Sequence, residues 1–264
     1  MRPDVSVIIP AYRRPVELEA ALRSVLSQAN VTTEIVVVDD CPDGSASAVV
    51  AGFHADGIRY LKNPEPSRGR PAVVRNLGWP LARGELVHFL DDDDLVPEGH
   101  YEAARAAFAA HRDVGVVFGR VEPFGAVDLT HERQYFADAT RRARRFARFG
   151  RRLGLGAAMV FGPTPLVCGA AMIRRSCIAD LGGFDPDLEL VEDVDFYARA
   201  IRRFGALVLD RVSLHYRIGP SLMHRPGQQD AIAACYRRIQ ARYRAEHGAL
   251  EFVLAKAFVR VMGG

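Results

Sequence analysis

Four consecutive aspartates, Asp91 to Asp94, are the residues of this sequence whose type and spacing point most directly to chemistry. Such neighbours repel one another unless a positive charge lies among them, and Mg²⁺ and Mn²⁺ prefer hard oxygen ligands. Successive strand residues point in opposite directions, so Asp91 and Asp93 can face one crevice while Asp92 faces away. The run alone predicts either a divalent-cation site or a solvated acidic turn in which Asp94 caps the next helix.

The elements before these aspartates indicate how they are positioned. Apolar, β-branched runs at 5–9, 34–38 and 85–90 are typical of buried strands, and helical periodicity follows the first of them over 16–28. This alternation predicts an α/β fold with a sheet covered by helices on both faces. Ligands of open α/β sheets bind outside the carboxyl ends of the strands, so three loops should meet in one crevice: Pro10 to Arg13, Asp39 to Asp40, and Asp91 to Asp94.

The remaining pattern continues the alternation with one gap. We expect helices at 45–55, 72–82, 97–111, 174–181 and 193–204, strands at 58–61, 114–121 and 206–210, and helix from Asp230 onward, whereas 122–165 has only a weak pattern. The apolar stretch 250–262 contains Lys256 and Arg260 and is too short and too charged to span a bilayer. It favours packing on the core or a subunit interface over membrane contact.

The strongest local charge run, Arg141 to Arg152, lies in the gap. Phe146, Phe149 and Leu153 follow one another at helical spacing within and just after it, which predicts a basic amphipathic helix. Three interpretations stay open: a solvated helix face, a contact with a phosphate-bearing acceptor, or a peripheral contact with an anionic membrane surface.

Composition excludes several classes of protein. With 264 residues, 49% of them apolar and 25% charged, the chain matches an ordinary globular protein rather than a disordered, fibrous or polytopic membrane protein. A net charge of +3 gives no case for nucleic-acid binding. The four cysteines are too scattered for a zinc knot or a disulfide framework. The N-terminus lacks the pattern of a signal peptide, so we expect a cytoplasmic protein, associated with the inner face of the membrane if the arginine run contacts lipid.

Four segments together carry a family resemblance: VSVIIPAYRRPVELEAALRSVLSQ, EIVVVDDCPDGS, RGRPAVVRNLGWPLARGELVHFLDDDDLVPEGH and GGFDPDLELVEDVDFYAR. In order and spacing they resemble the family 2 glycosyltransferases of the GT-A fold, over residues 3–220. The resemblance implies a Rossmann-like domain over 1–225 with a mixed, mostly parallel sheet flanked by helices. Its nucleotide-sugar half would be 1–120, its acceptor half 121–225, and 226–264 would form a helical C-terminal extension.

The resemblance also implies a donor-binding set. Asp40 matches the carboxylate that usually contacts the nucleobase, and the Arg75-Asn76 pair, with Gly69 upstream, is similar to the segment that lies along the nucleotide. The whole set is Pro10, Ala11, Tyr12, Arg13, Asp40, Arg75, Asn76, Asp91 and Asp92. Many relatives have Gly-Ser after the aspartate pair, whereas Cys41 and Pro42 stand here.

The aspartate run matches the family's Asp-x-Asp motif. By this resemblance Asp93, with Asp91, would hold the Mn²⁺ or Mg²⁺ ion that bridges the donor diphosphate. His215 is a third candidate ligand, and a hydrogen-bonded structural histidine is its alternative. His88, inside the strand before the aspartates, and Trp79 are predicted to be core residues.

Glu192 and Asp193 match the family's later Glu-Asp pair, in which Asp193 would be the general base; a helix N-terminal carboxylate is its alternative. One displacement with one base inverts the anomeric centre, so the expected reaction is a metal-dependent, inverting sugar transfer. The donor would be a nucleoside diphosphate sugar of the UDP or dTDP type, and the acceptor a glycan, a lipid-linked or a small-molecule hydroxyl.

Two alternatives remain. A sugar-nucleotide nucleotidyltransferase would carry a glycine-rich phosphate-binding segment after the first strand, where this chain has Pro-Ala-Tyr. A non-catalytic nucleotide- or carbohydrate-binding module would not need both the aspartate run and the Glu192-Asp193 pair.

Overall fold

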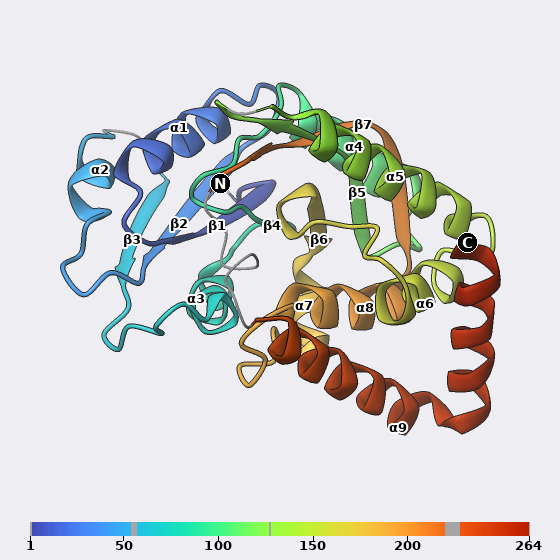
Figure 1. Ribbon diagram of the computed structural model, residues 1–264. Coiled ribbons are helices and arrows are strands. Elements are labelled where there is room, and N and C mark those ends of the chain that lie inside the picture. The colour runs from blue at the N-terminus through green and yellow to red at the C-terminus, as the bar shows by residue number, and fades with distance from the viewer. Residues whose placement is uncertain (1, 54–56, 127, 220–227, 264) are drawn as a thin grey trace.

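The computed structural model describes residues 2–53, 57–126, 128–219 and 228–263. At its centre lies a seven-stranded sheet in the order β3-β2-β1-β4-β6-β5-β7, with helices on both faces (Figure 1). This architecture confirms the predicted mixed, mostly parallel α/β fold.

The first four strands are parallel. β1 (Val5–Ala11) lies between β2 (Thr33–Asp39) and β4 (Leu86–Phe89), and β3 (Ile58–Lys62) pairs with the other side of β2. The connecting elements are α1 (Pro15–Leu26), α2 (Ser47–Ala51), α3 (Pro71–Gly78) and the short 3₁₀ helix η1 (Trp79–Leu81). A proline occupies the first turn of α1 and of α3, where its missing N–H costs no helical hydrogen bond.

The other three strands complete the sheet. β6 (Ala171–Arg174) runs antiparallel between β4 and β5 (Val116–Phe124), and β7 (Ala206–Arg217) pairs in parallel with β5 at the far edge. The helices of this half are α4 (His100–Ala110), α5 (Thr130–Ala147), α6 (Leu153–Phe161), η2 (Cys168–Ala170), α7 (Arg175–Leu181), α8 (Glu192–Phe204) and α9 (Gln228–Gly263).

Two hydrophobic cores cover the two faces of the sheet. Alternation along β1 sends Ile8 into the core shared with α3, α6 and α8, while Val7 and Ile9 enter the core shared with α1 and α4. His88 and Trp79 pack as predicted. His88 is fully buried between the Tyr101 hydroxyl (2.8 Å) and the Gly169 carbonyl (2.7 Å), and Trp79 packs on the first core.

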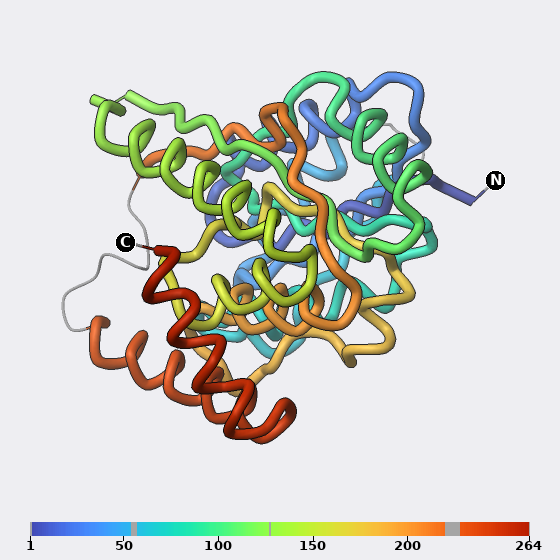
Figure 2. The backbone as a smooth tube through the Cα atoms, turned by 90° about the vertical axis from the view of Figure 1, so that its right-hand side faces the viewer, coloured from blue at the N-terminus to red at the C-terminus, as the bar shows by residue number. Residues whose placement is uncertain are grey.

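The C-terminal helix α9 consists of two limbs. Gly248, with φ 85°, separates a first limb (228–247) from a second limb (249–263), and both lie on one side of the molecule (Figure 2). The second limb ends beside the C-terminal part of α5 (Figure 1). Throughout the described ranges, each helix is either too short or too polar for a transmembrane span.

The predicted amphipathic helix over Arg141 to Arg152 is confirmed only as far as Ala147, and its continuation to Arg152 is wrong. α5 ends at Ala147, Gly150 turns the chain with φ 114°, and the apolar helix α6 then starts a new direction into the core. Phe146 is buried as expected, but Phe149 and Leu153 are half exposed. Three arginines of the run pair with carboxylates: Arg141 with Asp138, Arg144 with Asp210, and Arg151 with Asp113.

Four further boundaries differ from the sequence-based expectations. β1 continues through Pro10 to Ala11, which pair with Val38 and Asp39 of β2, and β7 continues to Arg217 rather than ending at 210. The region 122–165 contains α5 and α6, and α2 spans only Ser47–Ala51 within the helix expected at 45–55. The expected domain boundary at 225/226 lies outside the described residues.

Candidate active site

The loops after β1, β2 and β4 meet at the carboxyl edge of the sheet, as predicted from the sequence. The Tyr12 N–H donates to Asp92 Oδ2 at 2.8 Å, which joins the first loop to the aspartate run. The Arg13 N–H donates to the Cys41 sulfur at 3.0 Å, which joins it to the second loop. Cys41, at the position where the sequence departs from its family pattern, thus takes part in loop-to-loop contact.

Asp39 and Asp40 organise the second loop. Asp39 accepts backbone N–H groups of Cys41 (2.9 Å) and Ala46 (2.8 Å) and shapes the turn between them. Asp40 accepts hydrogen bonds from the Asn63 amide (2.7 Å) and from the Ser67 N–H (2.8 Å) and hydroxyl (2.6 Å). Asp40 is buried and holds the segment after β3 against the crevice, which the sequence did not reveal.

Arg14, which the sequence analysis did not select, neutralises part of the aspartate run. Its Nη1 lies 2.9 Å from Asp92 Oδ1 and 3.0 Å from Asp93 Oδ2. Tyr12 beside it is exposed at the mouth of the crevice, and the Arg13 guanidinium lies 5.4 Å from the Tyr12 ring centre. A flat ring and two guanidinium groups therefore line the entrance, which suits a base and phosphates.

The aspartates are held in an environment that disfavours their charge. Burial raises the pKa of Asp92 to about 7, against hydrogen bonds from Tyr12 and Arg14. Burial, followed by repulsion from Asp91, also raises the pKa of Asp93 and of Asp94. Asp94 Oδ2 is buried with no hydrogen-bond partner. These hard oxygen atoms, short of positive charge, fit a divalent cation.

The described residues contain no group of three His, Cys, Asp or Glu side chains already arranged around a cation position. The predicted ligands Asp91 and Asp93 lie in the crevice, where they pair with Arg75 and Arg14. His215 lies in β7, with Nδ1 3.4 Å from Glu122 Oε2 and its backbone paired with Leu95. Its role as a ligand stays a prediction.

Arg217, at the end of β7, is a second residue that the sequence analysis missed. Its backbone N–H donates to Asp94 Oδ1 (2.8 Å), and its Nε donates to the Asp93 carbonyl (2.9 Å). The last strand of the sheet thereby fixes the aspartate run from the side of β7. A lone arginine after a strand gives no sequence signal for this contact.

Arg75 brings the two acidic segments together. It is buried, and its Nη2 lies 2.8 Å from Asp91 Oδ1 while its Nη1 lies 2.5 Å from Glu192 Oε1. Asp193 follows Glu192 and is partly exposed; the charges of Arg75 and Asp91 act on its carboxyl group, whose Oδ1 accepts the Val194 N–H at 2.8 Å. The structure thus brings together acidic segments about a hundred residues apart in the sequence, and the role of Asp193 stays a prediction.

The backbone before this pair is strained. Val191 has φ 52° and ψ 29°, a left-handed conformation that β-branched residues rarely adopt, and it turns the chain into α8. Strain of this kind persists where the surroundings enforce it, and it concentrates at functional sites. Burial raises the pKa of Glu192 to about 7 and raises that of Asp193, although the Arg75 guanidinium favours the charged forms.

Asn76 of α3 holds the Gly183-Phe184 turn, which precedes the segment that carries Glu192 and Asp193. Its amide nitrogen donates to the Phe184 carbonyl (2.8 Å), and its oxygen accepts the Phe184 N–H (3.0 Å). Both polar atoms of the predicted donor-binding residue are thus committed to the Gly183-Phe184 turn. Asn76 holds this turn rather than presenting a free amide to the crevice.

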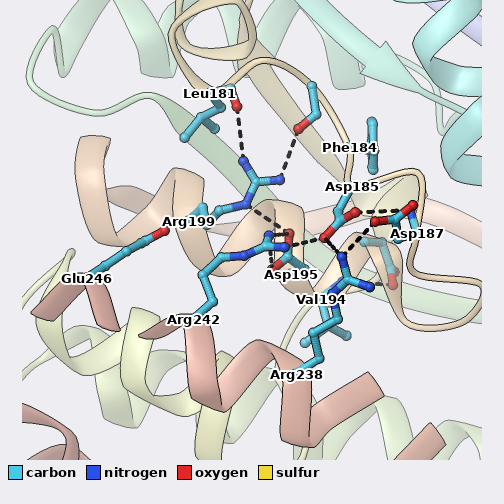
Figure 3. A network of polar contacts seen from close by, with 12 residues as sticks. Leu181, Phe184, Asp185, Asp187, Val194, Asp195, Arg199, Arg238, Arg242 and Glu246 are labelled. Carbon is cyan, nitrogen blue, oxygen red and sulfur yellow. Dashed lines mark hydrogen bonds and ion pairs between the residues drawn. The ribbon is translucent and has the colours of Figure 1, made fainter. Parts of the chain in front are cut away.

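A further network ties the active-site helix to α9 (Figure 3). Arg242 of the first limb donates from Nη1 to both oxygens of Asp195 (2.9 Å each) and pairs through Nη2 with Asp185. Arg199 donates to Asp195 Oδ2 (2.8 Å) and to the Gly183 carbonyl (2.9 Å). The network fixes both ends of the segment that carries Glu192 and Asp193. Asp195 and Arg199 are spaced four residues apart on α8, whereas no sequence pattern links either of them to Arg242.

Comparison with known proteins identifies relatives of this site. The model of glycosyl transferase family 2 matches residues 6–182. Uncharacterized protein MT1568 of Mycobacterium tuberculosis is 34% identical over 212 residues, which cover 76% of this chain and 63% of that protein. The GalNAc(5)-diNAcBac-PP-undecaprenol beta-1,3-glucosyltransferase of Campylobacter jejuni is 38% identical over 99 residues, 37% of this chain and 32% of that enzyme. The chain thus spans less than two thirds of these curated relatives.

Solved structures share the fold. Staphylococcus aureus TarS 1-349 in complex with UDP-GlcNAc aligns with a TM-score of 0.70 at 19% identity, over 96% of this chain and 69% of that one. The mannosyltransferase PcManGT of Pyrobaculum calidifontis, in complex with GDP-Man and Mn²⁺, aligns with a TM-score of 0.60 at 21% identity, over 99% and 81% of the two chains.

Proposed function

The chain belongs to glycosyltransferase family 2, and we propose that it transfers a sugar from a nucleoside diphosphate sugar to an acceptor hydroxyl. The observation that carries the proposal is the pair of contacts of Arg75 with Asp91 and Glu192. These contacts hold the aspartate run beside the start of α8, and this supports a shared site in which Asp193 would act with the aspartates, as single-displacement transfer requires. The nucleotide-sugar half would be 1–120, the acceptor half 121–225, and 226–264 the helical extension.

On the donor side, Tyr12 and Arg13 would face the nucleotide, with Asp40 and Asn76 holding the loops that shape its pocket. UDP or dTDP is the proposed nucleotide, supported by the TarS complex with UDP-GlcNAc. Asp91 and Asp93 would hold Mn²⁺ or Mg²⁺, with Arg14 and Arg75 adding positive charge around the diphosphate. When bound, the metal stabilises the negative charge of the departing diphosphate.

On the acceptor side, Asp193 would accept the proton of the attacking hydroxyl. Its pKa, raised by burial, lies nearer to that suited to a general base at neutral pH. Attack on the face opposite the departing diphosphate inverts the anomeric centre. The proposed acceptors are glycan, lipid-linked or small-molecule hydroxyls of the cell envelope, a class supported by the undecaprenol-linked substrate in the name of the Campylobacter relative. The predicted cytoplasmic location belongs to the same proposal.

The test supplies a panel of nucleotide sugars with Mn²⁺ or Mg²⁺ and candidate acceptors, and follows the nucleotide product. Release of nucleoside diphosphate together with a glycosylated acceptor supports the proposal. Exchange of pyrophosphate into the sugar nucleotide would instead identify a nucleotidyltransferase. Binding of every donor without turnover would identify a binding module.

A further inference from the structure

The second limb of α9 exposes an apolar stripe. Leu250, Val253, Leu254 and Val261 are between 60% and 76% exposed, and Ala257 lies among them. At 100° per residue these five positions fall on one face of a helix. The sequence favoured packing of this segment on the core or a subunit interface over membrane contact, and packing on the core is confirmed for the opposite face.

The opposite face attaches the limb to the body of the protein. Val259 is buried, the Phe258 ring lies 5.7 Å from Phe146 and 5.3 Å from Phe149, and the Phe252 ring lies 5.1 Å from Phe161. The limb is thus an element docked on α5 and α6 rather than a detached tail. Its apolar stripe faces outward while the helix itself is held in place.

The charges around the stripe all have one sign. Lys256 and Arg260 are exposed and flank the stripe on the Val253 side, and neither forms an ion pair within the described part of the chain. Glu251, the acidic residue of the limb, is turned inward, where it accepts hydrogen bonds from Arg202 (2.9 Å) and Tyr243 (2.7 Å). Among residues 249–263, which the structure describes, the outward face therefore combines apolar groups and cations without an acidic side chain.

A shallow hollow of about 510 Å³ between the two limbs extends this surface on its cationic side. Its lining includes Arg237 and Arg244 of the first limb and Ala249 and Phe252 of the second. The Arg244 guanidinium lies 6.0 Å from the Phe252 ring centre, over an apolar floor. Two guanidinium groups above an apolar floor suit a phosphate whose ester chains continue into an apolar phase.

We propose that this surface, the second limb with Arg237 and Arg244, binds an anionic phospholipid bilayer. The stripe enters the boundary between headgroups and acyl chains, and the cations contact lipid phosphates. A second copy of the chain fits less well, because antiparallel two-fold pairing along the stripe would bring Lys256 and Arg260 toward the same cations of the partner. The surface differs from the Arg141 to Arg152 run, in which three arginines are paired with aspartates.

The test is co-sedimentation of the full chain with vesicles of neutral phosphatidylcholine, with and without phosphatidylglycerol. We expect binding to the anionic vesicles that 0.5 M NaCl weakens. Val261→Glu combined with Leu254→Glu should weaken binding at least about tenfold, since two apolar anchors are lost. Lys256→Glu combined with Arg260→Glu should do the same, since nearby cations contribute about 1 kcal/mol each.

Matched controls separate these effects from general ones. Val16→Glu changes a valine of α1 that is as exposed as Val261, at 76%, and Arg112→Glu changes an exposed cation after α4; both should bind like the unaltered chain. Three results would overturn the proposal: no sedimentation of the unaltered chain, equal binding to neutral vesicles, or a dimer in solution that Val261→Glu dissociates. The salt effect needs no variant, so a variant that fails to fold leaves the test intact. The readout uses no donor or acceptor, so it is independent of the proposed transfer activity.

Discussion

At the scale of single residues, Arg75 has the most influence on the site. A buried guanidinium with one nitrogen on Asp91 and another on Glu192 joins the two acidic segments, and its charge opposes the effect of burial, which raises the pKa of Glu192 to about 7. Its fork geometry also fixes the distance between the aspartate run and the start of α8. One side chain thus positions the proposed metal ligand Asp91 and, through Glu192, the segment that carries the proposed base.

Asp193→Asn tests the proposed base. The amide keeps the size of the side chain but accepts no proton, so we expect the transfer rate to fall by about 10²- to 10⁴-fold. Donor affinity should change little, because Asp91 and Asp93 are untouched. The measurement is turnover together with titration of the donor. Asp187→Asn, an exposed carboxylate of the same segment, is the control, and turnover by Asp193→Asn equal to that control would exclude the role.

The protonation state of His88 tests whether the interior beneath Asp91 to Asp94 is closed to water as the structure shows. The Gly169 carbonyl can only accept, so Nε2 carries the proton and Nδ1 accepts from the Tyr101 hydroxyl. Burial lowers the pKa of His88 to about 4. The unfolded chain binds this proton near pH 6.5, so the stability that His88 contributes is complete above that pH and is lost as the pH falls toward 4.

The measurement is an NMR titration of the imidazole. The His88 resonance should stay in its neutral form from pH 8 to pH 5 in the folded protein. In the urea-unfolded chain it should titrate near pH 6.5, which serves as the control. A midpoint near 6.5 in the folded state would contradict the buried, hydrogen-bonded arrangement.

At the scale of elements, α9 braces the active-site segment. Its first limb supplies Arg242 and Arg238, which hold the turn at Asp185 and the first turn of α8 at Asp195 (Figure 3). Because Asp193 lies between these two points, displacement of the limb would move the proposed base. The helical extension is therefore part of the site's support.

Arg242→Ala and Arg238→Ala separate a buried contact of this brace from an exposed one. Arg242→Ala removes hydrogen bonds to buried Asp195, and we expect the free energy of unfolding to fall by about 2 kcal/mol or more. Arg238 pairs mainly with exposed Asp187, so Arg238→Ala should cost less than about 1 kcal/mol. Urea unfolding measures both. An equal loss of unfolding free energy in the two variants would show that the buried contacts of Arg242 stabilise the fold no more than the exposed pair of Arg238.

At the scale of the whole molecule, the parallel strands β1 to β4 (the first half of the sheet) and the strands β5 to β7 (the second half) form one body. β6 pairs with β4 of the first half and β5 of the second, and one hydrophobic core contains residues of α3, α6 and α8. Arg75 with Glu192 and Arg217 with Asp94 add polar contacts across the crevice. A donor bound in the crevice should therefore stabilise both halves together.

Thermal unfolding with ligands tests this coupling and the metal ligands. UDP or dTDP at about a hundred times its dissociation constant should add about 2.7 kcal/mol in a single transition, and Mn²⁺ should increase the effect. Asp93→Ala should lose the part that depends on Mn²⁺, and Mn²⁺ without nucleotide is the control. An unchanged Mn²⁺ effect in Asp93→Ala would contradict its role as a ligand, and two separate transitions would contradict the single body.

The sequence by itself determined most of the elements outside 122–165 and the edge of the sheet at which the candidate site lies. Strand and helix periods are local properties, and a parallel strand always delivers the residue after it to the same edge, so Tyr12, Asp40 and Asp91 could be placed together. The resemblance supplies the match of Glu192-Asp193 and assigns Arg75 to the nucleotide. The position of Arg75 between Asp91 and Glu192 comes only from the structure.

The tertiary structure alone decided which charges meet. Arg14, Arg217 and Arg242 have no periodic pattern, and their partners lie between 47 and 123 residues away, because folding brings such side chains together only after the elements have packed. The break at Gly150 likewise followed from burial of α6 rather than from the charge run. Local spacing fixes where a side chain points along its own element, whereas pairing across the molecule depends on packing that no local pattern encodes.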